Sequence, residues 1–189
     1  RGRRMVMADS QIARAIQDSE IKIFPLPHPD QIQPASLDVS LGESFITFSK
    51  DDGRVFDPSR GILPEGEKFT CPDQFVLRSG EFVLANTLES IGLPDDIVAR
   101  VEGCSSLGRL GLLVHVTAGF IDPGWPLAQI TLELCNVASY DLVLTPGMKI
   151  AQLSFERLEV RATRPYGSST LNSHYANQNG VTASRYGKV

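Results

Sequence analysis

Cysteine and histidine are scarce in this sequence, with three residues of each among 189. The cysteines, Cys71, Cys104 and Cys135, are far apart, odd in number and without C-x-x-C spacing. Neither a disulfide framework nor a thiolate zinc site is therefore expected. With so few histidines, we also expect no metal site built from protein side chains alone.

An excess of positive charge and long apolar runs are missing too. The formal net charge is -4, whereas a general nucleic-acid binder needs a clustered positive surface. The apolar runs are shorter than the roughly 18 residues of a membrane span. Three arginines within residues 1–4 are not followed by the apolar stretch of a signal peptide. We therefore expect a cytoplasmic protein with neither nucleic acid nor membrane as a partner.

The composition is that of a folded globular protein, with 42% hydrophobic and 21% charged residues. A chain of this length suits one domain, and neither an internal repeat nor a linker divides it. We predict a single domain over residues 1–189. It would comprise a core at 8–160 and a C-terminal tail at 161–189.

Short apolar runs between turn residues dominate the chain. Residues 9–19 have the period of a short amphipathic helix with a cap at Asp9 or Ser10. Residues 31–42 alternate like a half-buried strand. Further strands are predicted at 21–24, 45–48, 75–77, 82–85, 97–101, 112–116, 130–134, 142–144 and 150–155. Many short strands separated by Pro/Gly turns predict an all-β sandwich, barrel or jelly roll.

Glu133 is a candidate for chemistry. Within residues 130–134 apolar side chains alternate with polar ones, so Glu133 and Thr131 share the face away from the core. A solvated strand carboxylate is one interpretation. In a recessed site, the same carboxylate would act as a general base that moves protons between water and substrate.

A glycine-rich segment at 103–111 is the second candidate. It combines three glycines with Ser105, Ser106 and Arg109. Glycine allows close backbone approach, and hydroxyl, amide and guanidinium groups bind phosphate oxygens. The segment lacks the G-x-x-x-x-G-K-[ST] spacing of a Walker loop. A plain turn between strands is the alternative.

Three other positions have both a structural and a functional interpretation. His115 lies in the apolar run 112–116, where a structural histidine with satisfied ring nitrogens is expected. Asp122 opens an Asp-Pro-Gly turn and is a candidate for positioning water. Trp125 would either pack against the core or stack on a base. After about residue 161 the strand pattern ends, and the polar tail would either fray or fold over a ligand.

Six ordered motifs resemble the dCTP deaminases of the trimeric dUTPase superfamily. They are QPASLD at 33–38, EGCSSLGRLGL at 102–112, TAGFIDPG at 117–124, ITLEL at 130–134, PGMKI at 146–150 and PYGS at 165–168. The resemblance spans roughly residues 8–185. It implies an all-β, distorted jelly-roll or β-barrel fold of the trimeric dUTPase type, with a short N-terminal helix and an extended C-terminal tail.

The resemblance also implies an activity and its partners. The activity is hydrolytic deamination of dCTP to dUTP and ammonia without a catalytic zinc, and the sequence lacks the H-x-E and P-C-x-x-C pattern of zinc deaminases. The resemblance implies a homotrimer with interfacial active sites, Mg²⁺ bound through the nucleotide phosphates, and dTTP as a possible feedback inhibitor. The TAGFID form also occurs in bifunctional relatives that release dUMP and pyrophosphate.

By position, the resemblance implies that Glu133 is the general acid/base, aided by Ser105 and Arg109. The nucleotide-binding residues that it implies are Ser106, Thr117, Ala118, Asp122, Gln152, Tyr166, His174, Tyr175 and Gln178.

Several positions depart from the family pattern, and two of them remove positive charge. Cys104 and His174 stand where the family usually has Lys or Arg. Each lost charged hydrogen bond to phosphate is worth about 1.5–3 kcal/mol. Two further alternatives therefore stand beside the deaminase that forms dUTP and the bifunctional enzyme that forms dUMP. One is a deaminase with altered phosphate specificity, and the other is a nucleotide-binding protein without catalysis.

Overall fold

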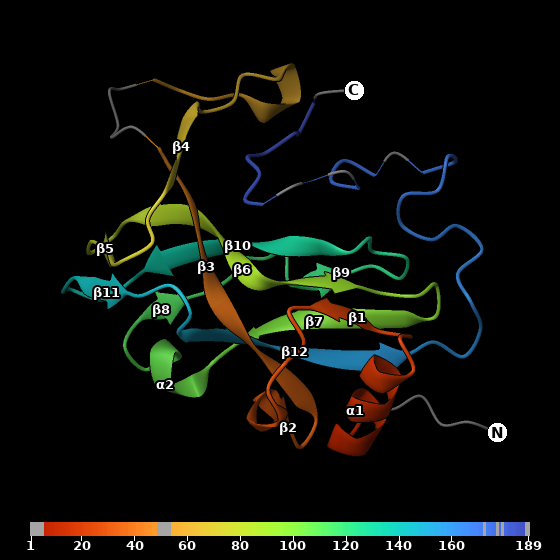
Figure 1. Cartoon of the computed structure of the whole chain (residues 1–189). Coiled ribbons are helices and arrows are strands. Elements are labelled where there is room, and N and C mark those ends of the chain that lie inside the picture. The colour runs from red at the N-terminus through yellow and green to blue at the C-terminus, as the bar shows by residue number, and fades with distance from the viewer. Residues whose placement is uncertain (1–5, 49–53, 172, 177, 179, 188–189) are drawn as a thin grey trace.

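The computed structural model describes residues 6–48, 54–171, 173–176, 178 and 180–187. The first residues of the predicted domain and a few positions of its tail therefore lie outside the described residues. Within the described part, a curled sheet has the strand order β8-β10-β6-β3-β12-β7-β9, with β1 on β6 and with β2 and β4 on β3 (Figure 1). Strands β11 and β5 form a separate pair.

The helices are α1 (Asp9–Gln17) and α2 (Ser105–Gly108), with 3₁₀ turns at Pro29–Gln31 and Pro58–Arg60. The strands are β1 (Lys22–Phe24), β2 (Ile32–Gln33), β3 (Ser36–Phe48), β4 (Gly66–Thr70), β5 (Phe75–Leu77), β6 (Phe82–Gly92), β7 (Ile97–Gly103), β8 (Leu112–Leu113), β9 (Phe120–Ile121), β10 (Ala128–Asn136), β11 (Leu142–Leu144) and β12 (Lys149–Arg157). The predicted all-β class is confirmed.

The long strand β3 makes the sheet curl. Its first half pairs with β12, with Val39 opposite Ala151, and its second half pairs with β6, with Phe45 opposite Ala85. Between the halves, a side chain at Gly42 would place a Cβ only 2.6 Å from the Asn86 amide. Glycine therefore permits the close approach at which the strand changes partners.

Helix α1 confirms the predicted amphipathic helix, and its residues Ile12 and Ala15 are buried. The predicted cap at Asp9 or Ser10 is wrong by one or two residues. Ala8 is the cap residue, and its N–H donates to the side-chain oxygen of Gln11 at 2.9 Å. An amide side chain from the first turn thus replaces the expected cap side chain.

The strand predicted at 31–42 is real but divided. It begins as β2, turns, and continues as β3, so the half-buried pattern holds only in part. Asp38 lies on the face expected to meet solvent, yet it is 6% exposed. Its carboxylate pairs with the Lys149 ammonium, which explains how a charged group can be buried there.

Some elements differ from the prediction. Strands β4 and β9 and helix α2 were not predicted, and β8 ends at Leu113 rather than continuing to residue 116. The chain leaves the strand there because the N–H groups of Val116 and Thr117 turn to a side chain of β10. Among the described residues, no helix is both long and apolar enough to cross a bilayer.

After β12 the described chain has no further strand, as expected, and runs along one side of the molecule before crossing above β10 (Figure 1). This tail is docked at its far end. Val181 is 2% exposed and packs with Ile46 and Leu84 in a small cluster beside the main core. The interpretation of a frayed tail is therefore wrong for these residues, because a buried anchor restrains them.

Candidate functional site

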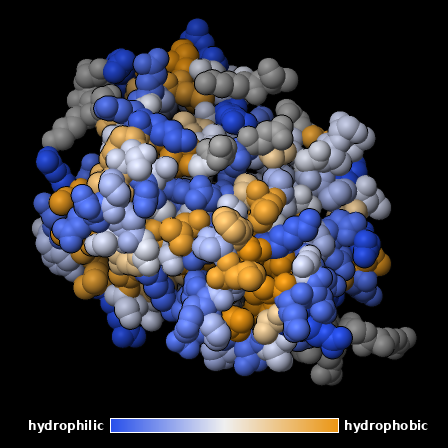
Figure 2. Space-filling view, viewed as in Figure 1, coloured by the Kyte–Doolittle hydropathy of each residue, from blue (hydrophilic) through white to orange (hydrophobic). Residues whose placement is uncertain are grey.

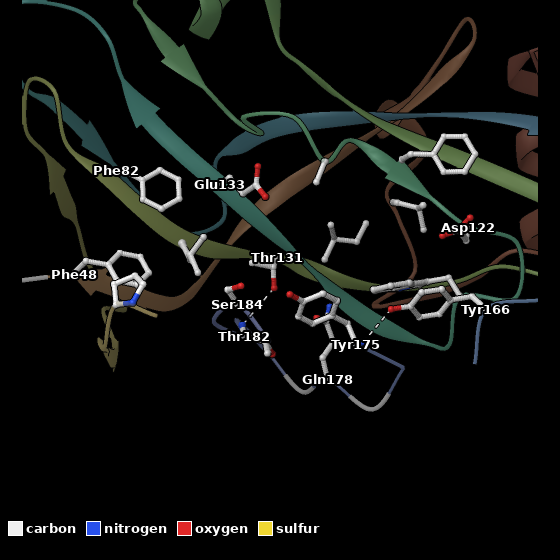
Figure 3. Close-up of a pocket in the computed structure, with 17 residues that line it drawn as sticks. Phe48, Phe82, Asp122, Thr131, Glu133, Tyr166, Tyr175, Gln178, Thr182 and Ser184 are labelled. Atoms are coloured by element: carbon white, nitrogen blue, oxygen red, sulfur yellow. Dashed lines mark hydrogen bonds between the residues drawn. The ribbon is translucent and has the colours of Figure 1, made fainter. Parts of the chain in front are cut away.

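A cavity of about 510 Å³ lies between the sheet and the docked tail (Figure 3). Of the residues that the resemblance singles out, the cavity lining contains Glu133, Asp122, Ala118, Tyr166, Tyr175 and Gln178. They come from β10, from the loop around β9 and from the tail. The structure thus places side chains 60 residues apart in sequence around one space large enough for a small-molecule ligand.

Glu133 lies on the outward face of β10, as the alternation predicts, because every second residue of this strand is buried. Its Oε2 accepts hydrogen bonds from the N–H groups of Val116 at 2.8 Å and Thr117 at 3.4 Å. Its own N–H donates to the Val114 carbonyl at 3.1 Å. One carboxylate oxygen is therefore held by the backbone, and the Glu133 side chain lines the cavity.

Asp122 follows β9 and lies beside Tyr166 at one end of the cavity, with Glu133 between it and Phe82 (Figure 3). The predicted turn is confirmed, since the Trp125 N–H donates to the Asp122 carbonyl at 3.2 Å. Gly124 has φ +87°, and a Cβ there would lie 2.6 Å from the Pro165 side chain. Glycine thus lets the start of the tail pass directly over this turn.

The tail forms the other wall. Trp125 packs against the core, as one interpretation predicts, but it also lines the cavity, so base stacking stays a prediction. Its ring lies 5.0 Å from that of Tyr166. The side-chain amide of Gln178 donates to the Gln129 carbonyl on β10 at 2.7 Å. Burial raises the pKa of the Tyr166 hydroxyl, the hydrogen bond from the Tyr175 backbone lowers it less, and the negative Asp122 raises it further.

The glycine-rich segment lies elsewhere. Ser105, Ser106 and Arg109 are exposed on and after α2, and they do not line the cavity. Figure 1 shows α2 below β8, on the side away from the tail. Gln152 belongs to this region, since it accepts from the Ser36 hydroxyl at 2.9 Å and donates to the Gly103 carbonyl at 3.3 Å. A single chain therefore presents the predicted site residues as two separate groups.

Two further predicted residues border the cavity without lining it. Thr117 reaches it only through its N–H on the Glu133 carboxylate. His174 is exposed, and its backbone carbonyl accepts from Arg185 at 2.7 Å. His115 differs from the prediction, because its Nδ1 is buried without a hydrogen-bond partner in the described chain, so its ring nitrogens are not both satisfied.

Cys104 stands near the ion pair between the buried Asp38 carboxylate and the exposed Lys149 ammonium. Burial raises the pKa of the Cys104 thiol, the Lys149 charge lowers it, and the Asp38 charge raises it. One carboxylate oxygen of Asp38, Oδ1, is buried without a hydrogen-bond partner in the described chain. The thiol at this position is therefore a protonated, weakly polar group near neutral pH.

Several residues of the cavity wall are not among the predicted site residues. Thr131 accepts from the Thr182 N–H at 3.3 Å, and the rings of Phe48 and Phe82 stack 5.9 Å apart. The alternation of β10 could have identified Thr131, since it shares the face of Glu133. Nothing in the local pattern marks the phenylalanines, because their partner is another strand.

Within the described residues, no three His, Cys, Asp or Glu side chains are grouped to hold a metal ion. The donors of the cavity that suit a hard cation are the carboxylates of Asp122 and Glu133. A cation at this site would thus need ligands from a bound anion in addition to protein oxygens.

Comparison with known proteins matches residues 6–158 to the dCTP deaminase-like family. The chain belongs to this family. It is 44% identical to "dCTP deaminase, dUMP-forming" of Dictyoglomus thermophilum, over 96% of this chain and 94% of that protein. It is 48% identical to the protein of the same name from Beutenbergia cavernae, again over 96% and 94%. A protein from Haloarcula marismortui named dCTP deaminase is 41% identical over 96% and 94%.

A solved structure supports the fold of this family member. The 2'-deoxycytidine 5'-triphosphate deaminase of Agrobacterium tumefaciens superposes with a TM-score of 0.64 at 24% identity. The match covers 82% of this chain and 48% of that chain, so the present chain corresponds to about half of it. The predicted fold type is confirmed.

Proposed function

We propose that this chain is a dUMP-forming dCTP deaminase, which uses two water molecules to convert dCTP into dUMP, ammonia and pyrophosphate. The observation that carries the proposal is the placement of Glu133 and Asp122 around one cavity. The names of the two relatives above, which match over nearly their full length, favour this bifunctional reaction over one that stops at dUTP.

In the deamination step, Glu133 takes a proton from water as the oxygen adds to C4 of cytosine. It gives this proton to the ring nitrogen, then takes the second proton from the new C4 hydroxyl and passes it to the amino group, so that C4=O forms and ammonia leaves. The backbone N–H groups of Val116 and Thr117 fix the carboxylate for this transfer. An oriented proton-transfer group contributes about 10²–10⁴-fold to such a reaction.

In the second step, water attacks the α-phosphorus and pyrophosphate leaves. Asp122 is exposed and lines the same cavity as Glu133, so it is suited to orient this water. Mg²⁺ would enter with the substrate, bound through the phosphates, because the described residues form no metal cage. The two carboxylates would thereby serve two different bonds of one nucleotide.

The phosphate-binding residues would come from a neighbouring copy in a homotrimer. Ser105, Ser106 and Arg109 are exposed and turned away from the cavity of their own chain. Figure 2 shows apolar side chains on the surface around β1, where Phe24 is 70% exposed. Leu26, just after β1, is 76% exposed. These features support an interface between copies. Any dTTP that acts as a feedback inhibitor would compete for the same pyrimidine and phosphate positions.

Product analysis tests the function. Purified protein with Mg²⁺ and dCTP should release ammonia, dUMP and pyrophosphate. Asp122→Asn should still release ammonia but accumulate dUTP. Wild-type product that stops at dUTP would overturn the bifunctional assignment.

The number of phosphates is tested in parallel with dCDP and dCMP. At position 104, where the family usually has Lys or Arg, this chain has a cysteine, and no Lys or Arg lines the described cavity. Both features reduce the positive charge available to bind phosphate. Preference for dCTP would show that these features do not weaken phosphate recognition. Failure to convert any of the three nucleotides, despite binding them, would favour a nucleotide-binding protein without turnover.

A further inference from the structure

Two tyrosines of the tail are linked in series by hydrogen bonds to the backbone. The hydroxyl of Tyr166 accepts from the N–H of Tyr175 at 3.0 Å. The hydroxyl of Tyr175 accepts in turn from the N–H of Arg185 at 3.2 Å. Both tyrosines line the cavity. The position of the second ring over the cavity therefore depends on what holds Arg185.

The Arg185 side chain returns to the same tyrosine. Its guanidinium carbon lies 5.8 Å from the centre of the Tyr175 ring. Its Nη1 donates to the carbonyl of His174, the residue just before Tyr175, at 2.7 Å. A cation on an aromatic face and a charge-assisted hydrogen bond act together here. Arg185 thus contacts Tyr175 at the ring and at the hydroxyl, and it also holds the backbone just before it.

Arg185 itself follows a fixed point. Four residues earlier, Val181 is buried, and its carbonyl accepts from the Lys68 ammonium of β4 at 3.1 Å. Thr182 is bound to Thr131 on β10. The guanidinium is therefore attached to the sheet through a short stretch of chain.

We propose that Arg185 is a positioning residue for the nucleotide site, which holds the Tyr175 ring against the cavity and keeps the tail closed. This inference rests on the proposed function, since it concerns the closing of the same site. Arg185 is not expected to touch the reacting atoms. It acts by raising the fraction of chains whose tail is in the binding-competent position.

The expected effect follows from that fraction. If fewer chains are closed, apparent substrate affinity falls in proportion. Arg185→Gln removes the charge from the ring and the guanidinium from the His174 carbonyl, so KM for dCTP should rise roughly three- to tenfold. The value of kcat should change by less than about twofold, because bound nucleotide restores closure. Arg185→Lys keeps the charge but loses the planar donor geometry and should give an intermediate KM.

The experiment compares wild type, Arg185→Gln, Arg185→Lys and the control Arg161→Gln. Arg161 also carries an exposed tail cation, but it pairs with Asp95, away from the tyrosines. Steady-state kinetics with dCTP and Mg²⁺ give KM and kcat. Amide hydrogen exchange at Tyr175, measured without nucleotide, reports closure of the tail independently of turnover.

The proposal expects faster exchange at Tyr175 and a raised KM in Arg185→Gln, partial recovery in Arg185→Lys, and neither change in Arg161→Gln. Unchanged exchange at Tyr175 would overturn it, as would equal kinetic effects of the two glutamine variants. If wild type converts no deoxycytidine nucleotide, the proposed function fails. The exchange comparison then still decides whether Arg185 holds Tyr175.

Discussion

The two walls of the cavity are built in different ways. The sheet wall carries Glu133 on β10, which pairs along its length with β6 and has its alternate side chains in the core. The tail wall carries Tyr166, Tyr175 and Gln178, which are held mainly by side-chain hydrogen bonds and one buried anchor, Val181. Strand pairing and core packing fix the first wall, whereas the described residues of the tail form no strand with the sheet.

This difference assigns a separate task to each wall. A proton-transfer group must keep its geometry throughout the reaction, which a paired strand provides. A closing segment must release product, so it should open at a low free-energy cost. Under the proposed function, chemistry and access therefore lie in different walls, and substitutions in the two walls should change different observables.

The largest effect is expected at the sheet wall. Glu133→Gln keeps the shape of the side chain but cannot take a proton, so kcat for ammonia release should fall by about 10²–10⁴-fold. KM should change far less than kcat. The matched control is Glu67→Gln, which alters an exposed strand carboxylate on β4. Ammonia release by Glu133→Gln at a rate near wild type would remove the general base from the proposal.

Stability should also separate the walls. Leu132, next to Glu133 on β10, is 1% exposed, and Leu132→Ala should lower the free energy of unfolding by about 2–5 kcal/mol. Val181→Ala truncates an equally buried side chain, but its global effect should stay below about 1 kcal/mol, because the tail can detach before the core unfolds. Denaturant titration measures both. Equal losses would mean that tail and sheet form one cooperative unit.

Much of the sheet wall could be predicted from the sequence. The alternation around Glu133 is local, since each residue of a strand faces opposite to its neighbour, and the period identifies the outward face directly. The turn at Asp122 is also local, because it is closed by a hydrogen bond to Trp125, three residues along the chain. The structure agrees with both.

The contacts between distant segments could not be predicted in this way. The Glu133 carboxylate binds N–H groups 16 and 17 residues away, and Gln178 binds a carbonyl 49 residues away. No period or turn signal encodes such pairs. Composition alone could not distinguish a frayed tail from a docked one. The docked end depends on the burial of Val181 against Ile46 and Leu84, which are distant in sequence.

A smaller effect is expected from the first tyrosine of the tail wall. Tyr166→Phe keeps the ring on Trp125 but removes the hydroxyl that accepts from the Tyr175 N–H. Loss of one neutral hydrogen bond, about 0.5–1.5 kcal/mol, should lower kcat/KM for dCTP by roughly two- to tenfold, mainly through KM. Tyr186→Phe, which alters an exposed tyrosine of the same tail, is the control. A fall confined to kcat would contradict a role in closure.

The same tyrosine adds a pH dependence to the tail wall. Burial raises the Tyr166 pKa above its usual value of 10.0, so the docked tail favours the neutral phenol. A raised pKa gives stabilisation that is complete below the unfolded-state pKa and is lost as pH rises through the folded-state pKa. Amide exchange at Tyr175 should therefore show extra opening of the tail only above about pH 10, beyond the ordinary base-catalysed increase. In Tyr166→Phe, this extra opening should be absent. Its persistence there would assign the titration to another group.

The smallest expected effect lies outside both walls, at Cys104 beside α2. Burial raises the pKa of this thiol and the Lys149 charge lowers it, so Lys149→Met should raise it further. At pH 8 less thiolate is then present, and alkylation of Cys104 by iodoacetamide, followed by peptide mass spectrometry, should slow by a few-fold relative to wild type. Alkylation of Cys71 in the same sample is the internal control. Faster alkylation of Cys104 would instead mean that Lys149 shields the thiol, so that the ion pair with Asp38 acts as a steric cover rather than as a charge.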